Sequence, residues 1–166
     1  MGELDGWKTC PRCAADLTAD AGAVRCAACG LVVYAKPSPA VCALPVDDEG
    51  RVLLARRAQE PGAGGWDVLG GFMEEFEQPL DALRREFREE LDVEIEPLQF
   101  VTAVSDRYGD DGPATLNLCW TARIVSGELR PSEELAEIRW FGPDEVPSPD
   151  EFAFPNCHEM VAAWRR

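Results

Sequence analysis

Short stretches in which apolar residues alternate with polar ones, or run together briefly, predict strands in the middle of the chain. Residues 40–46 and 51–57 are apolar runs with β-branched members, and the Asp-Asp-Glu-Gly between them at 47–50 suits a hairpin turn. From Ala114 to Ile124 every second residue is apolar, which is typical of a half-buried strand. Residues 98–104 are expected to pair with that strand.

Two other stretches repeat with the period of a helix. Residues 78–91 form the best helix of the chain by length and by the recurrence of apolar residues every three or four positions. Near the end, Asn156 is expected to be an N-cap, with Glu159 three residues later. The apolar face of this short terminal helix, which should pack on the sheet, consists of Cys157, Met160, Val161 and Trp164.

The composition of the chain indicates its class of protein, and a proline-rich segment predicts a domain boundary. With 166 residues, 46% of them apolar and 28% charged, it is typical of a soluble globular protein, and no apolar run approaches the roughly 18 residues that cross a bilayer. The N-terminus has no secretion or transit pattern, so we expect a cytoplasmic protein with no membrane partner. The sequence Lys-Pro-Ser-Pro at 36–39 predicts a boundary between a small module, residues 1–36, and a main domain, residues 37–166.

Four of the seven cysteines have the spacing of a metal site. Two Cys-X-X-Cys pairs are separated by twelve residues, and such a quartet can close tetrahedrally on Zn²⁺. Because a fully thiolate site leaves no position for water, this zinc should be structural. The alternative is four unrelated thiols. The quartet consists of Cys10, Cys13, Cys26 and Cys29; the remaining three cysteines are expected to be small core residues.

The net charge of −15 is unevenly distributed. Residues 1–40 hold four acids and four bases, whereas residues 41–166 hold 27 acids and 12 bases. An acidic surface repels nucleic-acid backbones, so no nucleic-acid partner is expected. An anionic substrate would need divalent cations in order to bind.

Three carboxylates fall on one arc of the predicted helix at 78–91. At about 100° per residue, Glu86, Glu89 and Glu90 border its apolar stripe. Clustered carboxylate oxygens are the ligands that Mg²⁺ and Mn²⁺ prefer. The alternative is a solvated face on which neighbouring arginines form i,i+4 pairs.

The stretch from Gly71 to Val93 resembles the signature of the Nudix hydrolases. It contains glycine, five residues, Glu77, seven residues, and then the sequence Arg-Glu-Phe-Arg-Glu-Glu-Leu-Asp-Val. One position departs from the family pattern: Asp92 replaces a glycine, and we expect it to adopt the left-handed conformation that caps a helix. The resemblance extends over most of residues 40–166.

This resemblance implies the fold and the roles of individual residues. The implied fold is α/β (α+β), a Nudix-like α/β/α sandwich around a mixed sheet, here preceded by a small zinc ribbon. Glu86, Glu89 and Glu90 would bind Mg²⁺ or Mn²⁺ with the Gly70 carbonyl. Glu134 would be a further ligand or the general base, with Glu133 and Glu137 as alternatives. The implied chemistry is attack of a metal-activated water on phosphorus. Glu77 and Arg85 would brace the loop that Gly71 begins, and the contacts with substrate are assigned to Arg56, Arg57 and Tyr108.

The expected substrate is a small molecule that carries a nucleoside diphosphate. A four-cysteine ribbon before a Nudix domain resembles the layout of NADH pyrophosphatases, but their Ser-Gln-Pro-Trp-Pro-Phe-Pro segment is absent from residues 105–112. We therefore favour ADP-ribose or a similar compound over NADH or nucleoside triphosphates. Two alternatives remain, a catalytically idle Nudix ligand sensor and a zinc-ribbon binding module. A homodimer is one candidate assembly.

Overall fold

Residues 4–166, which the computed structural model describes, divide between Pro37 and Ser38 into two units. The first contains a three-stranded antiparallel sheet in the order β1-β2-β3. Among residues 4–37 only Cys10, Ala23, Val24 and Cys26 are buried, so this unit has almost no apolar core to hold it together. Its strands are β1 (Leu17–Asp20), β2 (Ala23–Cys26) and β3 (Val32–Tyr34).

The second unit is built on two sheets. The larger has the order β7-β4-β9-β8, in which β4 and β9 run parallel and the other pairs antiparallel. The smaller has the order β10-β5-β6 and is antiparallel throughout. Their strands are β4 (Ser38–Pro45), β5 (Val52–Arg57), β6 (Trp66–Asp67), β7 (Leu69–Phe72), β8 (Val93–Arg107), β9 (Ala114–Gly127) and β10 (Leu135–Phe141).

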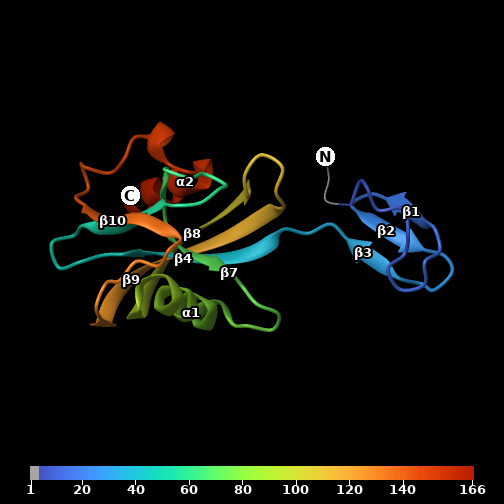
Figure 1. Cartoon of the computed structure of the whole chain (residues 1–166), viewed down its shortest axis with the longest axis horizontal. Helices are drawn as coiled ribbons and strands as arrows, with labels where there is room; N and C mark the ends of the chain where they lie inside the picture. Colours follow the sequence, from blue (N-terminus) through green and yellow to red (C-terminus); the bar gives the residue numbers. More distant parts are fainter. Residues whose placement is uncertain (1–3) are drawn as a thin grey trace. The chain divides into compact units, whose positions relative to one another are not determined.

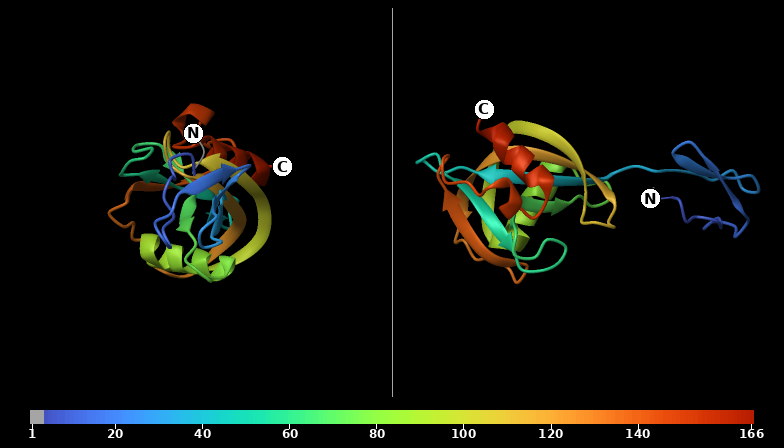
Figure 2. Two further views of the ribbon diagram at one scale, coloured as in Figure 1. Left: turned by 90° about the vertical axis from the view of Figure 1, so that its right-hand side faces the viewer. Right: turned by 90° about the horizontal axis from the view of Figure 1, so that it is seen from above.

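Helix α1 (Pro79–Leu91) and helix α2 (Pro155–Trp164) lie on opposite sides of the layer that the two sheets form (Figures 1 and 2). Each closes its own apolar cluster: Leu83 and Phe87 belong to the one under α1, Met160 and Val161 to the one under α2. A short 3-10 helix, η1 (Pro149–Glu151), precedes α2. In the described part of the chain neither helix has the length and hydropathy needed to span a bilayer. The predicted α/β/α sandwich with a mixed sheet is confirmed.

The predicted hairpin at 47–50 is wrong in its pairing. Strands β4 and β5 belong to different sheets, and only one bridge, Val46 with Val52, joins the segments beside the turn. The reason is that β4 is an inner strand, whose two edges are taken by β7 and β9. Turn chemistry therefore located the chain reversal, but it did not determine which strands pair.

Strand β9 pairs with β8 as predicted, yet it is not half-buried. Ala122 packs in the cluster under α1, while Cys119 on the opposite face packs in the cluster under α2. An interior strand with a helix on each side buries both faces, which the alternation of apolar residues does not reveal.

The cap of α2 also differs from the prediction. Phe154 is the N-cap, Pro155 takes the first helical position, and Asn156 lies inside the first turn. The Asn156 backbone N–H donates instead to the Asp106 carboxylate at 3.2 Å. Proline at the first position needs no hydrogen-bond partner, so it determines where the helix starts.

Helix α1 ends as predicted, in a left-handed residue. Asp92 has φ 57° and ψ 37°, and its backbone N–H donates to the Arg88 carbonyl at 3.0 Å. This conformation strains a side chain with a Cβ, although aspartate tolerates it better than most residues. Its ion pair with Arg130, at 3.7 Å between two exposed side chains, contributes little.

Asp92 therefore supports a stability test. Asp92→Gly and Asp92→Ala both remove the carboxylate, but only glycine adopts a positive φ without strain. We expect the glycine variant to be the more stable by about 1 kcal/mol in free energy of unfolding. Urea unfolding followed by circular dichroism measures the difference. Equal midpoints for the two variants would show that the backbone at residue 92 is not strained.

Candidate metal sites and active-site cavity

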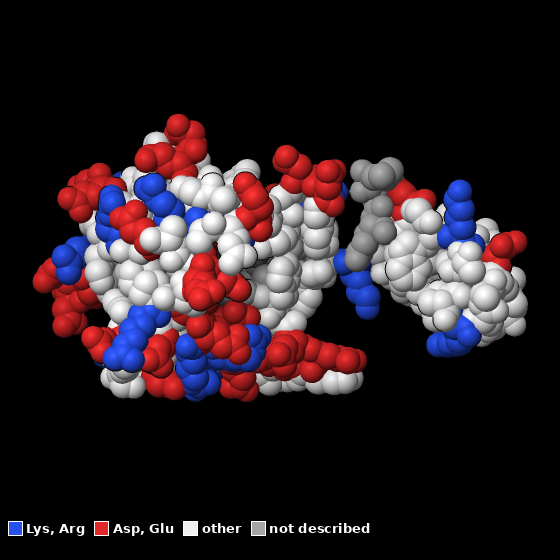
Figure 3. Space-filling view, viewed as in Figure 1, with Lys and Arg blue, Asp and Glu red and all other residues white. Residues whose placement is uncertain are grey.

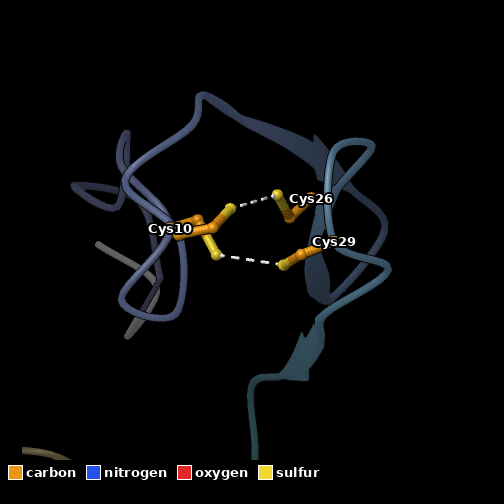
Figure 4. Close-up of side chains that lie close together, drawn as sticks. Cys10, Cys26 and Cys29 are labelled. Carbon is orange, nitrogen blue, oxygen red and sulfur yellow. Dashed lines mark hydrogen bonds between the residues drawn. The ribbon is translucent and has the colours of Figure 1, made fainter.

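The four predicted zinc ligands converge in the N-terminal unit. All four sulfurs lie within 4.8 Å of one another, with 3.6 Å between Cys10 and Cys29 and 3.5 Å between Cys13 and Cys26 (Figure 4). A tetrahedral ion with metal–sulfur bonds of about 2.3 Å separates its ligands by about 3.8 Å, so the quartet fits zinc. The Cys29 backbone N–H, hydrogen-bonded to Cys26, is the main cause that lowers the pKa of the Cys26 thiol to about 7. That favours the thiolate which a metal binds.

A separate cavity of about 330 Å³ opens in the larger unit. That volume lies at the lower end of the range for small-molecule sites. Its carboxylates come from α1, β6 and the loop before β10, whereas its aromatic side chains come from the ends of β7 and β8 and the start of α2. The charged and aromatic lining residues are Arg57, Asp67, Phe72, Glu86, Glu90, Arg107, Tyr108, Glu134 and Phe154.

Glu90 is a cavity carboxylate that the backbone of β7 holds. Its Oε2 accepts a hydrogen bond from the Gly70 backbone N–H at 3.2 Å. Burial first, and then the negative charges of Glu86, Asp67 and Glu134, raise its pKa to about 8. At neutral pH the group therefore keeps its proton unless a cation replaces that proton. Clustered acids of this kind suit a hard divalent ion.

The neighbouring Arg85 orders the other acids of α1. Its Nε and Nη2 each donate to the Glu77 carboxylate at 2.9 Å, and Nη2 also donates to the Phe72 carbonyl at 3.0 Å. Nη1 donates to Glu86 at 2.7 Å and to Glu89 at 3.1 Å. These contacts use all five donors of the guanidinium. Mainly because of Arg85, the pKa of Glu77 falls to about 2, so this carboxylate is charged throughout the physiological range.

Two glycines allow β7 to approach its neighbours closely. Gly70 has φ 140°, and a Cβ placed there would lie 2.2 Å from the Val41 carbonyl oxygen on β4. A Cβ on Gly71 would lie 2.5 Å from the Glu86 carboxyl group. The first contact is with backbone and the second with a side chain. Gly70 is therefore needed for sheet pairing, and Gly71 for the position of Glu86.

The remaining predicted acids lie differently. Glu89 does not line the cavity; its side chain is 61% exposed and pairs with Arg85. Glu134, in the loop before β10, lines the cavity, whereas Glu137 lies within β10 and pairs with Arg56 at 3.4 Å. Glu133 is exposed and outside the lining.

Two of the three predicted substrate contacts reach the cavity. Arg57 and Tyr108 line it and are joined by a 2.9 Å hydrogen bond from Nη2 to the phenol oxygen. Arg56 points elsewhere: its guanidinium carbon lies 4.6 Å from the centre of the Trp66 ring. Adjacent residues of a strand face opposite sides, so β5 directs only one of the two arginines toward the carboxylates.

Asp67 and Phe154 are cavity residues that no motif indicated. Asp67 accepts a hydrogen bond from Arg57 Nη1 at 2.9 Å, and Phe154 is the N-cap of α2. A signal for the first was present, because Asp67 is a single acid in the run Trp-Asp-Val-Leu at 66–69. A charge inside a buried strand usually has a partner or a function.

Outside the cavity the larger unit is predominantly acidic. Red carboxylate side chains outnumber blue basic ones on the face shown in Figure 3. This agrees with the 27 acids and 12 bases of residues 41–166.

Comparison with known proteins identifies the family. The model of the NUDIX domain matches residues 36–162, which include both sheets and the whole cavity. Two curated relatives are the NAD-capped RNA hydrolases NudC of Stutzerimonas stutzeri, 33% identical over 84% of this chain, and of Chromobacterium violaceum, 32% identical over 83%. The alignments cover 49% and 51% of those proteins, so the chain spans about half the length of the curated relatives it matches.

Solved structures agree in fold. The crystal structure of a NUDIX hydrolase from Nitrosomonas europaea superimposes with a TM-score of 0.79 and 24% identity, over 95% of this chain and 90% of that one. A MutT NUDIX hydrolase from Burkholderia pseudomallei gives 0.69 and 27%, over 77% of this chain and 98% of that one. The signature from Gly71 to Val93 thus lies on β7 and α1 of a domain that the family model matches over most of its length. This chain belongs to the Nudix family.

Proposed function

We propose that the protein is a divalent-metal-dependent pyrophosphohydrolase that cleaves the diphosphate linkage of a nucleoside-diphosphate-linked small molecule. The observation that carries the proposal is the buried Glu90 carboxylate, which the Gly70 N–H holds beside Glu86 and Glu134 in one cavity. A carboxylate that is withdrawn from water beside other acids is costly unless a proton or a cation neutralises it. Family membership adds that chains with this signature are hydrolases.

Mg²⁺ or Mn²⁺ fits this donor set. In our proposal Glu86 and Glu90 bind the ion from α1, with the Gly70 carbonyl and Glu89 completing the set, as the family signature implies. Among residues 4–166 the cysteines alone have three or more ligand atoms within 4.8 Å of one another. The carboxylates are spread more widely, since like charges repel when no cation lies between them. When bound, the metal supplies a Lewis acid for the phosphoryl oxygens and lowers the pKa of a water.

Glu134 is our candidate for the proton acceptor. It lines the cavity, and within residues 4–166 its carboxylate forms no ion pair. By contrast Glu86 and Glu89 both form ion pairs with Arg85, which orients them. A free carboxylate at the rim can take the proton of an attacking water, provided the substrate phosphorus sits between it and α1.

The charge of the cavity favours a diphosphate neutralised by cations. Arg57 is paired with Asp67 at 2.9 Å, whereas Arg107 donates to the neutral Gly112 carbonyl at 2.6 Å and has no carboxylate partner within residues 4–166. One unpaired guanidinium does not balance the carboxylates of the cavity, so we propose that divalent cations help to bind the substrate. We propose ADP-ribose or a similar compound as the preferred substrate, and we expect NADH and nucleoside triphosphates to be poorer substrates.

A second candidate substrate is suggested by the relatives. Two of them are named NAD-capped RNA hydrolases, and NAD also contains a diphosphate between two nucleosides. The acidic surface of the larger unit argues against an RNA body lying across it. An idle ligand sensor or a zinc-ribbon binding module is disfavoured, because each leaves the complete set of signature glutamates without a purpose.

We also propose that the N-terminal unit holds one structural zinc per chain. The purified protein should contain one equivalent, and Cys26→Ser combined with Cys29→Ser should abolish it, because the remaining pair cannot close a tetrahedron. Elemental analysis by mass spectrometry measures the metal. The larger unit, which has its own core, should keep its folded circular dichroism signal. Zinc retained by the double variant would contradict the assignment.

Removing the charge of Glu90 tests the hydrolase mechanism. Glu90→Gln keeps an acceptor for the Gly70 N–H but weakens the hold on a divalent ion, so kcat should fall about a hundredfold or more. Glu89→Gln should also reduce kcat. Glu75→Gln, at an exposed loop position outside the cavity, is the matched control and should leave kcat unchanged.

This comparison must be made across a Mg²⁺ titration, since excess metal can refill a weakened site. Circular dichroism checks that all the variants are folded. If Glu90→Gln and Glu75→Gln have the same activity at low metal, the carboxylates are not part of the mechanism, and the sensor hypothesis gains support.

Substrate preference is the next prediction. Because the segment typical of NADH pyrophosphatases is missing from residues 105–112, kcat/KM should be higher for ADP-ribose than for NADH. Both compounds are assayed at the same metal concentration, with products identified by mass. A clear preference for NADH would mean that Tyr108 and its neighbours replace the missing segment.

A further inference from the structure

The guanidinium of Arg57 lies in the wall of the cavity but is already committed. Its Nε donates to the Pro61 carbonyl at 2.7 Å, its Nη1 to Asp67 at 2.9 Å and its Nη2 to the Tyr108 hydroxyl at 2.9 Å. Asp67 is held in turn by the Cys157 thiol, which donates to its other oxygen at 3.0 Å. An arginine fixed on three sides has little freedom to reach a phosphate.

Around Arg57, three aromatic rings form a continuous wall. The Tyr108 ring lies between the other two, with its centre 5.4 Å from that of Phe72 and 5.5 Å from that of Phe154. The Arg57 guanidinium carbon is 5.7 Å from the Tyr108 ring centre and 5.3 Å from that of Phe154. One arginine thus contacts two rings and anchors the hydroxyl of one.

All three rings line the same cavity as the carboxylates. They come from separate parts of the chain: Phe72 ends β7, Tyr108 follows β8 and Phe154 precedes α2. Aromatic faces beside a polar cavity offer stacking surface to a planar ring. The ion pair with Asp67 also neutralises the positive charge of Arg57. The aromatic wall is therefore better suited to bind a planar ring than an anion.

We infer that Arg57 is a positioning residue that holds Tyr108 in place, so that Phe72, Tyr108 and Phe154 form a subsite for a planar aromatic ring of the substrate. This inference deepens the proposed function, because the ring would be the nucleobase or the nicotinamide attached to the diphosphate. Phosphate recognition is then left to the carboxylates and their cation. Sequence alone assigns Arg57 to direct contact with the substrate, and the two roles make different predictions.

Binding of small fragments separates those roles without turnover. AMP and nicotinamide mononucleotide each carry a planar ring on ribose 5-phosphate, so ribose 5-phosphate is the matched ringless probe. Isothermal titration calorimetry at fixed Mg²⁺ measures the binding of all three ligands to the 166-residue chain. The wild type should bind at least one ring-bearing probe more tightly than ribose 5-phosphate, and the comparison of AMP with nicotinamide mononucleotide shows which ring the wall accepts.

Three variants test the wall and its anchor. Tyr108→Leu should bind the preferred ring-bearing probe about tenfold more weakly, because the probe can no longer stack on the tyrosine ring. Arg57→Lys keeps the positive charge beside Asp67, but a lysine cannot hydrogen-bond to all three partners in the same geometry. Tyr108→Phe removes only the hydroxyl that Arg57 anchors. Each variant should bind the preferred ring-bearing probe about threefold to fivefold more weakly. Ribose 5-phosphate should change by less than twofold in all three. Arg56→Lys, one residue away but packed on Trp66, is the control and should change neither affinity.

Several results would overturn the inference. Equal weakening of ribose 5-phosphate and the ring-bearing probe in Arg57→Lys would make Arg57 a phosphate ligand. Unchanged binding of both ring-bearing probes in Tyr108→Leu, or equal wild-type affinity for AMP, nicotinamide mononucleotide and ribose 5-phosphate, would show that no ring subsite exists. Thermal unfolding verifies that the variants are folded. Because none of these measurements requires hydrolysis, they remain interpretable even if the chain cleaves no diphosphate.

Discussion

The burial of the Glu90 carboxylate constrains the structure around it. A carboxylate taken out of water needs hydrogen bonds and either a proton or a positive charge. One hydrogen bond comes from the Gly70 N–H, and no ion pair within residues 4–166 supplies the charge. For β7 to come that close, residue 70 must lack a Cβ, since β4 lies 2.2 Å from where one would be. Gly70 and Gly71 on β7 and Glu86 and Glu90 on α1 therefore depend on one another for their packing.

The fold separates two tasks that a nucleotide hydrolase must combine. Helix α1, strand β6 and the loop before β10 supply the carboxylates, and Arg85 orients Glu86 and Glu89 of α1 by contacts that, with those to Glu77 and Phe72, use all its donors. The aromatic wall is assembled from the ends of β7 and β8 and the start of α2. Two of the cavity carboxylates therefore lie on one helix, while the aromatic rings lie on segments that can vary without disturbing that helix.

Local patterns predicted much of this, and contacts between distant segments account for what they missed. The period of 78–91 located α1 to within a residue, and the left-handed Asp92 followed from its motif position. The hairpin prediction failed because strand partners are chosen by the whole sheet, and the cap of α2 because Pro155 outweighs the capping preference of Asn156. Asp67 was missed because its importance depends on Arg57, a partner on another strand.

The charge distribution links these observations to specificity. Arg57 is neutralised by Asp67, and Arg107 is the one lining arginine without a carboxylate partner within residues 4–166, so a diphosphate meets little fixed positive charge beside the carboxylates. In the proposed function, its binding depends on the same cations that would neutralise Glu90. Since every candidate substrate carries a diphosphate, the cation provides affinity for all of them alike and cannot choose among them. Discrimination has to come from what is attached to the diphosphate, and the groups in this cavity suited to recognise it are the aromatic rings that Arg57 holds together.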